Sequence, residues 1–158
     1  MAAERAGNRA GLVITVAVLA FLHFALSPAT ASWFARPNLL LCAVLVAALQ
    51  VRPGASAAVG FVLGLLEDAM AVSHFGLATI SLVILAYVGS QARAVFLGEE
   101  PLFMGTYVLL GTWVYEVGTY LILGAGGDTL SFILLRAPLD GLATAVVGYL
   151  TLPLVRGR

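Results

Sequence analysis

Apolar runs close to the length of a membrane-spanning helix fill this chain almost from end to end. A helix needs about 20 mostly apolar residues to cross the hydrocarbon core of a bilayer. Charged residues make up 10% of the 158 positions and hydrophobic residues 61%, which leaves too little charged surface for a soluble domain of this length. The sequence therefore predicts an all-α integral membrane protein, a compact bundle of about six transmembrane helices forming one domain over residues 1–158.

Proline, glycine and charged residues divide the apolar sequence into segments. Six helices are predicted, over residues 9–26, 38–51, 55–72, 75–96, 102–123 and 131–155. We expect the first to end at Ser27-Pro28. The second and third are short and separated by Arg52-Pro53-Gly54, a turn that excludes one long helix. They are predicted to form a tight hairpin whose members are tilted or stop short of a full crossing.

The amino-terminal segment also resembles a signal peptide. Arg5 and Arg9 precede the apolar run, and Ala29-Thr30-Ala31 resembles a small-residue cleavage site. The run is about as long as a bilayer-spanning helix and further spans follow it. A retained signal anchor is therefore the favoured interpretation.

The arginines predict the orientation. With six helices and the amino terminus inside, six arginines fall on the cytoplasmic side and only Arg36 and Arg136 on the other. This is a clear positive-inside bias, which predicts N-in and C-in topology for a multi-pass inner-membrane protein. The zero formal charge gives no electrostatic reason to expect nucleic acid as a partner.

Ionisable residues at membrane depth are costly and usually have a role. Glu67 and Asp68 are adjacent, so their side chains diverge by about 100° around a helix. One is expected to turn inward and the other to approach the interface near Ser73-His74. A buried role in pairing with a base or with backbone N–H groups is favoured for Asp68. For Glu67, that role and simple contact with headgroup water are equally consistent with the sequence.

Glu116 lies midway along the fifth predicted helix, with no other charge in that helix one turn away. A Glu116–Arg136 ion pair is one hypothesis. The alternative is that Arg136 extends to the outer interface. Asp140 follows Pro138, and with Gly141 it is predicted to mark a kink.

The remaining polar and sulfur-containing residues do not form a recognisable catalytic or metal-binding motif. His23, His74, Trp33, Trp113 and Cys42 are expected to serve packing or interfacial roles, and no set has metal-ligand spacing. No motif of a hydrolase, metalloprotease or nucleotide-binding protein is present, so no enzymatic activity and no cofactor are expected. Gly60 and Gly64 form a Gly-x-x-x-Gly pattern that allows close helix approach, a weak signal alone.

Several of these residues occur in an order that resembles the rod shape-determining protein MreD family. The matching segments are Arg36-Pro37-Asn38, then Gly60-Phe61-x-x-Gly64-Leu-x-x-Asp68, Gly76-Leu77-Ala78 and Ala86-Tyr87. One departure is Asn38, where the family often has an acidic residue, so a charge contact there would become a neutral hydrogen bond.

The resemblance implies a role in cell-wall elongation in rod-shaped bacteria. It implies binding to the single-span protein MreC, action with a RodA-type glycosyltransferase and a class B penicillin-binding protein, and an indirect link to MreB filaments. The family also resembles the S components of energy-coupling-factor transporters, so a small-solute-binding transporter subunit is the alternative function. The structural or partner-binding candidates are Pro37, Asn38, Gly60, Gly64, Glu67, Asp68, Gly76, Tyr87, Glu116, Arg136 and Asp140.

Overall fold

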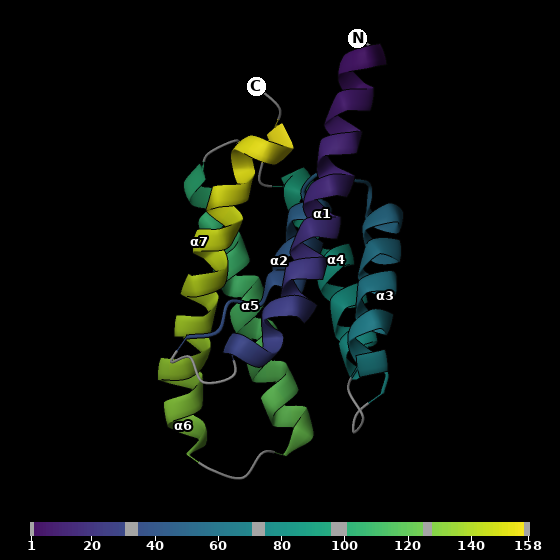
Figure 1. Cartoon of the computed structure of the whole chain (residues 1–158). Coiled ribbons are helices and arrows are strands. Elements are labelled where there is room, and N and C mark those ends of the chain that lie inside the picture. The colour runs from purple at the N-terminus through teal and green to yellow at the C-terminus, as the bar shows by residue number, and fades with distance from the viewer. Residues whose placement is uncertain (1, 31–34, 71–74, 96–100, 125–127, 157–158) are drawn as a thin grey trace.

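A computed structural model describes residues 2–30, 35–70, 75–95, 101–124 and 128–156, and within these ranges every regular element is helical. The helices are α1 (Ala2–Thr30), α2 (Leu39–Ala48), α3 (Pro53–Met70), α4 (Leu77–Val95), α5 (Pro101–Leu123), α6 (Thr129–Ser131), η1 (Phe132–Arg136) and α7 (Ala137–Arg156). The last three form one continuous helical segment with a π-helical turn in the middle, so the chain is a six-helix bundle, as predicted (Figure 1).

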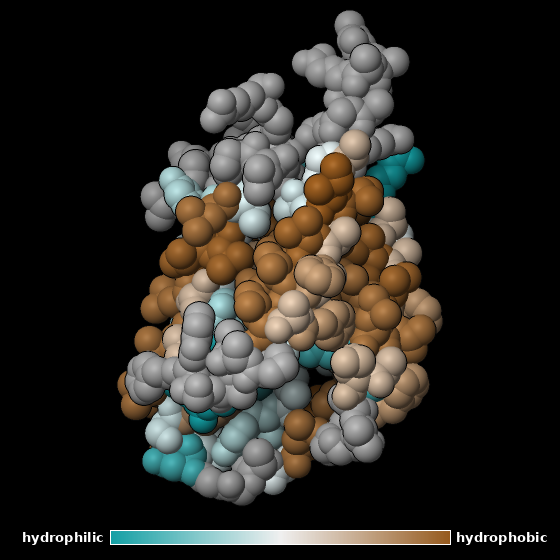
Figure 2. All heavy atoms as spheres, in the orientation of Figure 1, coloured by the Kyte–Doolittle hydropathy of each residue, from teal (hydrophilic) through white to brown (hydrophobic). Residues whose placement is uncertain are grey.

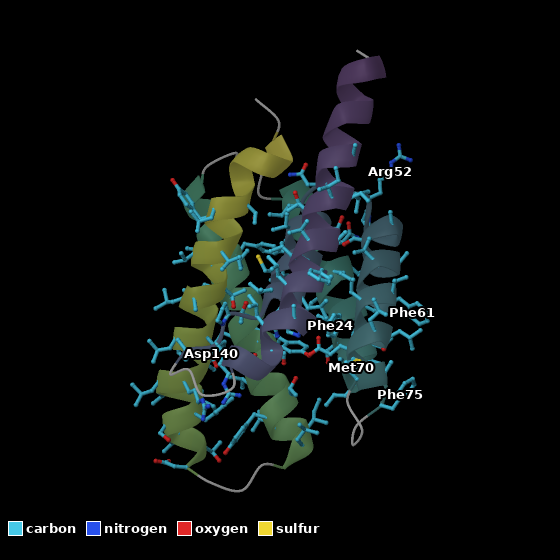
Figure 3. The ribbon with its side chains drawn as sticks, viewed as in Figure 1. Phe24, Arg52, Phe61, Met70, Phe75 and Asp140 are labelled. Carbon is cyan, nitrogen blue, oxygen red and sulfur yellow. The ribbon has the colours of Figure 1, made fainter. Side chains whose placement is uncertain are left out.

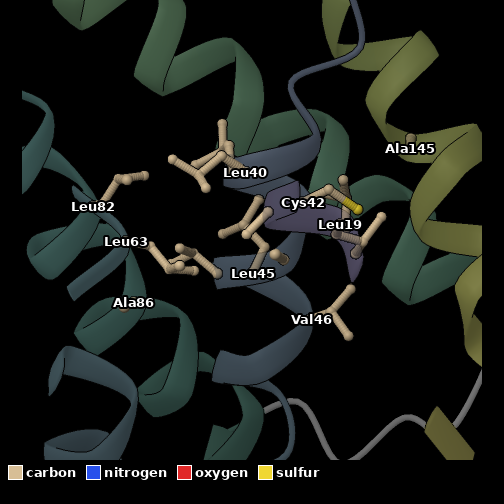
Figure 4. Close-up of a cluster of buried hydrophobic side chains, with 14 residues drawn as sticks. Leu19, Leu40, Cys42, Leu45, Val46, Leu63, Leu82, Ala86 and Ala145 are labelled. Atoms are coloured by element: carbon tan, nitrogen blue, oxygen red, sulfur yellow. The ribbon is translucent and has the colours of Figure 1, made fainter. Parts of the chain in front are cut away.

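The short helix α2 forms the centre of the bundle. It packs against α1, α3, α4, α5 and α7, and all ten of its residues are buried. Its side chains Leu40, Leu41 and Leu45 meet Leu63 of α3 and Leu82 of α4 in the hydrophobic core (Figure 4). An apolar helix without a polar face is stable only when it is surrounded, which is the position α2 occupies.

The length of α2 decides one question that the sequence left open. Ten residues rise about 15 Å, half of the ~30 Å hydrocarbon thickness. The second helix is therefore shorter than the predicted 38–51 and does not have the length for a full crossing. The polar residues that precede it are consequently held inside the bundle.

Helices α3 and α4 form the closest pair, and glycines make their approach possible. A Cβ on Gly60 would lie 2.6 Å from the carbonyl oxygen of Leu82, and one on Gly64 would lie 2.5 Å from Cα of Thr79. Both distances are shorter than real Cβ atoms tolerate. Gly76 has a φ of 100° just before α4, a conformation that favours glycine.

The π-helical turn η1 has a local explanation. Pro138 has no N–H, so it cannot bond to a carbonyl in the preceding turn. In the π pattern, in which Ala137 N–H donates to Phe132 O, the carbonyl deprived by Pro138 is that of Ile133. The indole N–H of Trp113 on α5 donates to this oxygen at 3.0 Å. The predicted distortion thus lies before Pro138 rather than at Asp140-Gly141.

The surface is largely apolar around the middle of the bundle. Figure 2 shows a brown hydrophobic band there and teal hydrophilic residues toward the end that carries α6. Phe61, Ile84, Leu121 and Val146, from four different helices, are more than half exposed. Among the described residues, Ala10–Ser27 and Thr129–Thr151 are each long and apolar enough to cross a membrane.

Helix boundaries differ from the sequence prediction mainly at prolines. Helix α1 continues through Pro28 to Thr30, so the predicted end at Ser27-Pro28 is wrong. A proline two residues from the end of a helix interrupts only its last turn. Pro53 and Pro101 begin α3 and α5, because the first helical position needs no N–H partner. Trp33, Ser73 and His74 lie outside the described residues.

Candidate functional site

Polar side chains gather where α1 ends, α2 begins and η1 joins α7. Asn38 caps α2, because its Oδ1 accepts a hydrogen bond from the backbone N–H of Leu41 at 3.0 Å. The Asn38 N–H donates to Thr144 Oγ1 at 2.9 Å, and the Thr144 hydroxyl donates to the Asp140 carbonyl at 2.7 Å. Pro37, in front of the cap, contributes to the wall of the adjacent cavity. The start of the central helix is thus tied to α7.

Asp140 strengthens the same connection. Its side chain on α7 is buried, and its Oδ1 accepts the backbone N–H of Arg36 at 2.6 Å. Figure 3 shows Asp140 toward one end of the bundle, away from Arg52 near the other. Asp140 therefore anchors the segment that leads into α2. Sequence reasoning had linked this residue to a kink and had included it among the structural or partner-binding candidates.

A cavity of about 540 Å³ opens beside this anchor. Its charged and polar lining residues are His23, Ser27, Arg36, Asn38, Glu116, Arg136 and Asp140. Apolar side chains of Leu26, Leu39, Phe132 and Val147 form the rest of the wall. The cavity volume lies within the ~300–1,000 Å³ range of ligand sites in proteins.

Glu116 and Arg136 face this cavity from α5 and η1. Glu116 interacts with the Asn38 side chain and lies within electrostatic reach of Arg136, Arg36 and Asp140. Among the described residues, the close contact between an acidic and a basic side chain joins His23 to Glu67, and none joins Glu116 to Arg136. The hypothesised Glu116–Arg136 ion pair is therefore not formed. The two residues instead place opposite charges on the walls of a common cavity.

His23 links α1 to both α2 and α3. Its Nδ1 accepts the backbone N–H of Leu40 at 3.4 Å, and its Nε2 lies 3.6 Å from Glu67 Oε2. With Nδ1 acting as an acceptor, the ring proton is on Nε2, the nitrogen that faces the carboxylate. Glu67 is half-buried against α1 and faces the basic side chain of His23, which corresponds to the first of the two roles that the sequence had left open, pairing with a base.

Asp68 has a different environment from its neighbour. It is 2% exposed, and its carboxylate accepts the backbone N–H groups of Ala78 at 3.1 Å and Thr79 at 2.9 Å. The Thr79 hydroxyl donates to the same carboxylate at 2.5 Å. The first N–H groups of a helix have no partner within it, so Asp68 acts as the amino-terminal cap of α4 from a different helix.

The residues that carry the family resemblance differ in where they lie in the bundle. Gly60 and Gly64 lie in the α3–α4 contact, and Gly76 forms the turn before α4. Tyr87, in contrast, is 47% exposed on α4. Sequence reasoning missed Thr79 and Thr144 as polar partners. Both are threonines within apolar helices, and their partners come from other helices or segments, which sequence spacing does not reveal.

The geometry favours binding and structural roles for these side chains. Among the described residues, no group of three His, Cys, Asp or Glu side chains is placed to hold a metal ion. The one cysteine, Cys42, is buried within α2. The carboxylates of Asp68 and Asp140 accept backbone N–H groups, which fixes helix ends rather than activating a nucleophile.

Comparison with known proteins identifies the family. The model for the family described as "rod shape-determining protein MreD" matches residues 7–156, almost the whole chain. The comparisons with curated proteins and with solved structures give no match. The likeness to transporter S components therefore stays a prediction. The match over residues 7–156 shows that this chain belongs to the MreD family of membrane proteins, which act in determining rod shape.

Proposed function

We propose that this protein is a non-enzymatic scaffold of the cell-wall elongation machinery in the bacterial inner membrane. It binds the single-span protein MreC and, with it, a RodA-type glycosyltransferase and a class B penicillin-binding protein, and it is linked indirectly to MreB filaments. The observation that carries the proposal is the family match over residues 7–156. The bundle supports it, because most buried polar groups fix helices to each other and leave an apolar surface for lipid and protein contacts.

The proposed topology is N-in and C-in with several passes through the membrane. The start of α1 and the end of α7 lie at the same end of the bundle, whereas α6 lies at the opposite end (Figure 1). This arrangement agrees with the arginine distribution. Reporter fusions at Arg93 and Asp128 are expected to report opposite sides of the membrane. The same side for both would contradict the topology.

Tyr87 is the motif residue that we propose for partner contact. The motif residues Gly60, Gly64 and Asp68 are used inside the α3–α4 pair, so they are not available to another protein, and Gly76 is a turn residue without a side chain. Tyr87 is available, because nearly half of its surface is exposed on the apolar face of α4. Aromatic residues of this kind are favoured in protein interfaces.

Photocrosslinking tests both the partner and the surface. A photoreactive amino acid at Tyr87 in living cells is expected to crosslink to an MreC-type partner. The matched control is Tyr149 on α7, which is 55% exposed and should crosslink mainly to lipid. Crosslinks to the partner from Tyr149 but not from Tyr87 would place the interface on the other side of the bundle. If neither Tyr87 nor Tyr149 crosslinks to a protein partner, the scaffold proposal is contradicted for the faces of α4 and α7 that carry them.

The second candidate function is a small-solute-binding subunit of a transporter. The 540 Å³ cavity with charged walls is the observation that favours it. This function predicts saturable binding of a water-soluble compound to the purified protein, dependent on Glu116. Asp68 does not line this cavity, because its carboxylate is fully engaged at the start of α4.

A further inference from the structure

The cavity between α1, α5, η1 and α7 has features that point to a particular ligand. Its charged groups are balanced: Arg36 and Arg136 carry positive charge, and Glu116 and Asp140 carry negative charge. Pockets that hold anionic lipid headgroups are strongly basic instead. A balanced set of charges favours a ligand that carries one charge of each sign.

The positions of Glu116 and Arg136 strengthen this argument. They belong to different helices, and both face the cavity. No salt bridge joins their side chains in the described part of the chain. Two opposite charges separated by an open space fit a group that bridges them. The π-helical turn stabilised by Trp113 is the element that carries Arg136 to the cavity wall.

The apolar part of the wall indicates where such a group is attached. Leu26, Leu39, Phe132 and Val147 line the same cavity, in a protein whose surface is largely apolar around the middle of the bundle (Figure 2). A water-soluble zwitterion has no need for these contacts, whereas an acyl-chain glycerolipid does.

We propose that this cavity binds the headgroup of a phospholipid that carries a phosphate and a primary ammonium, as in phosphatidylethanolamine. Arg136 donates to the phosphate, because a guanidinium pairs with phosphate oxygens in a two-point geometry. Glu116 accepts the ammonium, and the apolar wall contacts the start of the acyl chains. This inference goes beyond the scaffold function and does not depend on MreC.

Native mass spectrometry of the purified full-length protein tests the site. The protein is delipidated and then titrated with phosphatidylethanolamine, phosphatidylglycerol or the chain-free head glycerophosphoethanolamine. We expect wild type to retain phosphatidylethanolamine best. Arg136→Gln should weaken retention of both lipids about tenfold, as expected for loss of a charge-assisted hydrogen bond. Glu116→Gln should weaken phosphatidylethanolamine alone and so reverse the preference between the two lipids.

Arg52→Gln is the matched control, because Arg52 is exposed near the other end of the bundle (Figure 3). It should bind both lipids as wild type does. If Arg136→Gln does not fold, Arg136→Lys keeps the charge without the planar fork and should give an intermediate loss. Three results would overturn the proposal: equal or tighter binding of phosphatidylglycerol by wild type, binding of the chain-free head as tight as that of the lipid, or equal losses in Arg52→Gln and Arg136→Gln.

Discussion

Two regions of this bundle use carboxylates in opposite ways. At the α3–α4 turn, Asp68 is fully buried and accepts three hydrogen bonds from Ala78 and Thr79. Around the cavity, Glu116 and Arg136 face an open space without pairing. The first region is closed and complete, whereas the second is the cavity for which we propose a ligand. The comparison teaches that an acid in a membrane helix is not in itself a binding site, since its hydrogen-bond partners decide its role.

The largest expected effect is at the closed region. Asp68→Ala leaves the N–H groups of Ala78 and Thr79 without partners in a buried site, which costs ~1–3 kcal/mol for each group. We expect a loss of several degrees or more in the thermal unfolding midpoint in detergent. The adjacent Glu67→Ala is the matched control, because its 3.6 Å contact with His23 contributes less than about 1 kcal/mol. Equal decreases in the unfolding midpoints of Asp68→Ala and Glu67→Ala would contradict the different roles of these two adjacent residues.

The next effect concerns the close approach of α3 and α4. Gly64→Ala places a methyl group against the Thr79 backbone, and the required shift should cost ~1–3 kcal/mol of folding free energy. Gly118→Ala on α5 adds the same methyl group where no atom lies within 4 Å. That control should be neutral or slightly stabilising. Unfolding curves of the two variants, measured in the same detergent, check the difference, and a neutral Gly64→Ala would argue against the packing described.

A smaller effect is expected at the junction of the two regions. Asn38→Ala removes the side-chain cap of α2 and should cost about 1 kcal/mol. Asn38→Asp keeps a capping oxygen but puts a second negative charge beside Glu116. We expect it to retain stability better than Asn38→Ala and to shift lipid preference in the cavity toward stronger retention of an ammonium head. If Asn38→Asp retains lipid as wild type does, the residue that caps α2 does not influence binding in the cavity.

The sequence predicts the architecture better than it predicts the sites. Six apolar segments and the Gly60–Gly64 pattern follow from composition and spacing, because both depend on neighbours along the chain. The complete burial of α2 does not follow, since it depends on five other helices packing around ten residues. A buried role for Asp68 with backbone N–H groups was expected from the sequence, but its partners were not, because Thr79 is identified only when α4 folds back along α3.

The cavity is the feature least accessible to sequence reasoning. Its lining comes from α1, the segment before α2, α5, η1 and α7, so no motif contains it. Glu116, Arg136 and Asp140 were predicted to matter because charges are rare in such helices. Their arrangement depends on the π-helical turn. This turn is stabilised by Trp113 on another helix, which donates a hydrogen bond to the carbonyl of Ile133.

We propose above all that this member of the MreD family works as a scaffold that binds other proteins of the cell-wall elongation machinery. Affinity purification of the full-length chain from native membranes under mild detergent tests it most directly. We expect a single-span coiled-coil protein of the MreC type to copurify with wild type and with Arg136→Gln, since Tyr87, the proposed contact residue, lies on α4, and no described residue of α4 lines the cavity. Recovery of an ATPase pair with a T-type coupling subunit instead would contradict the account and favour the transporter function.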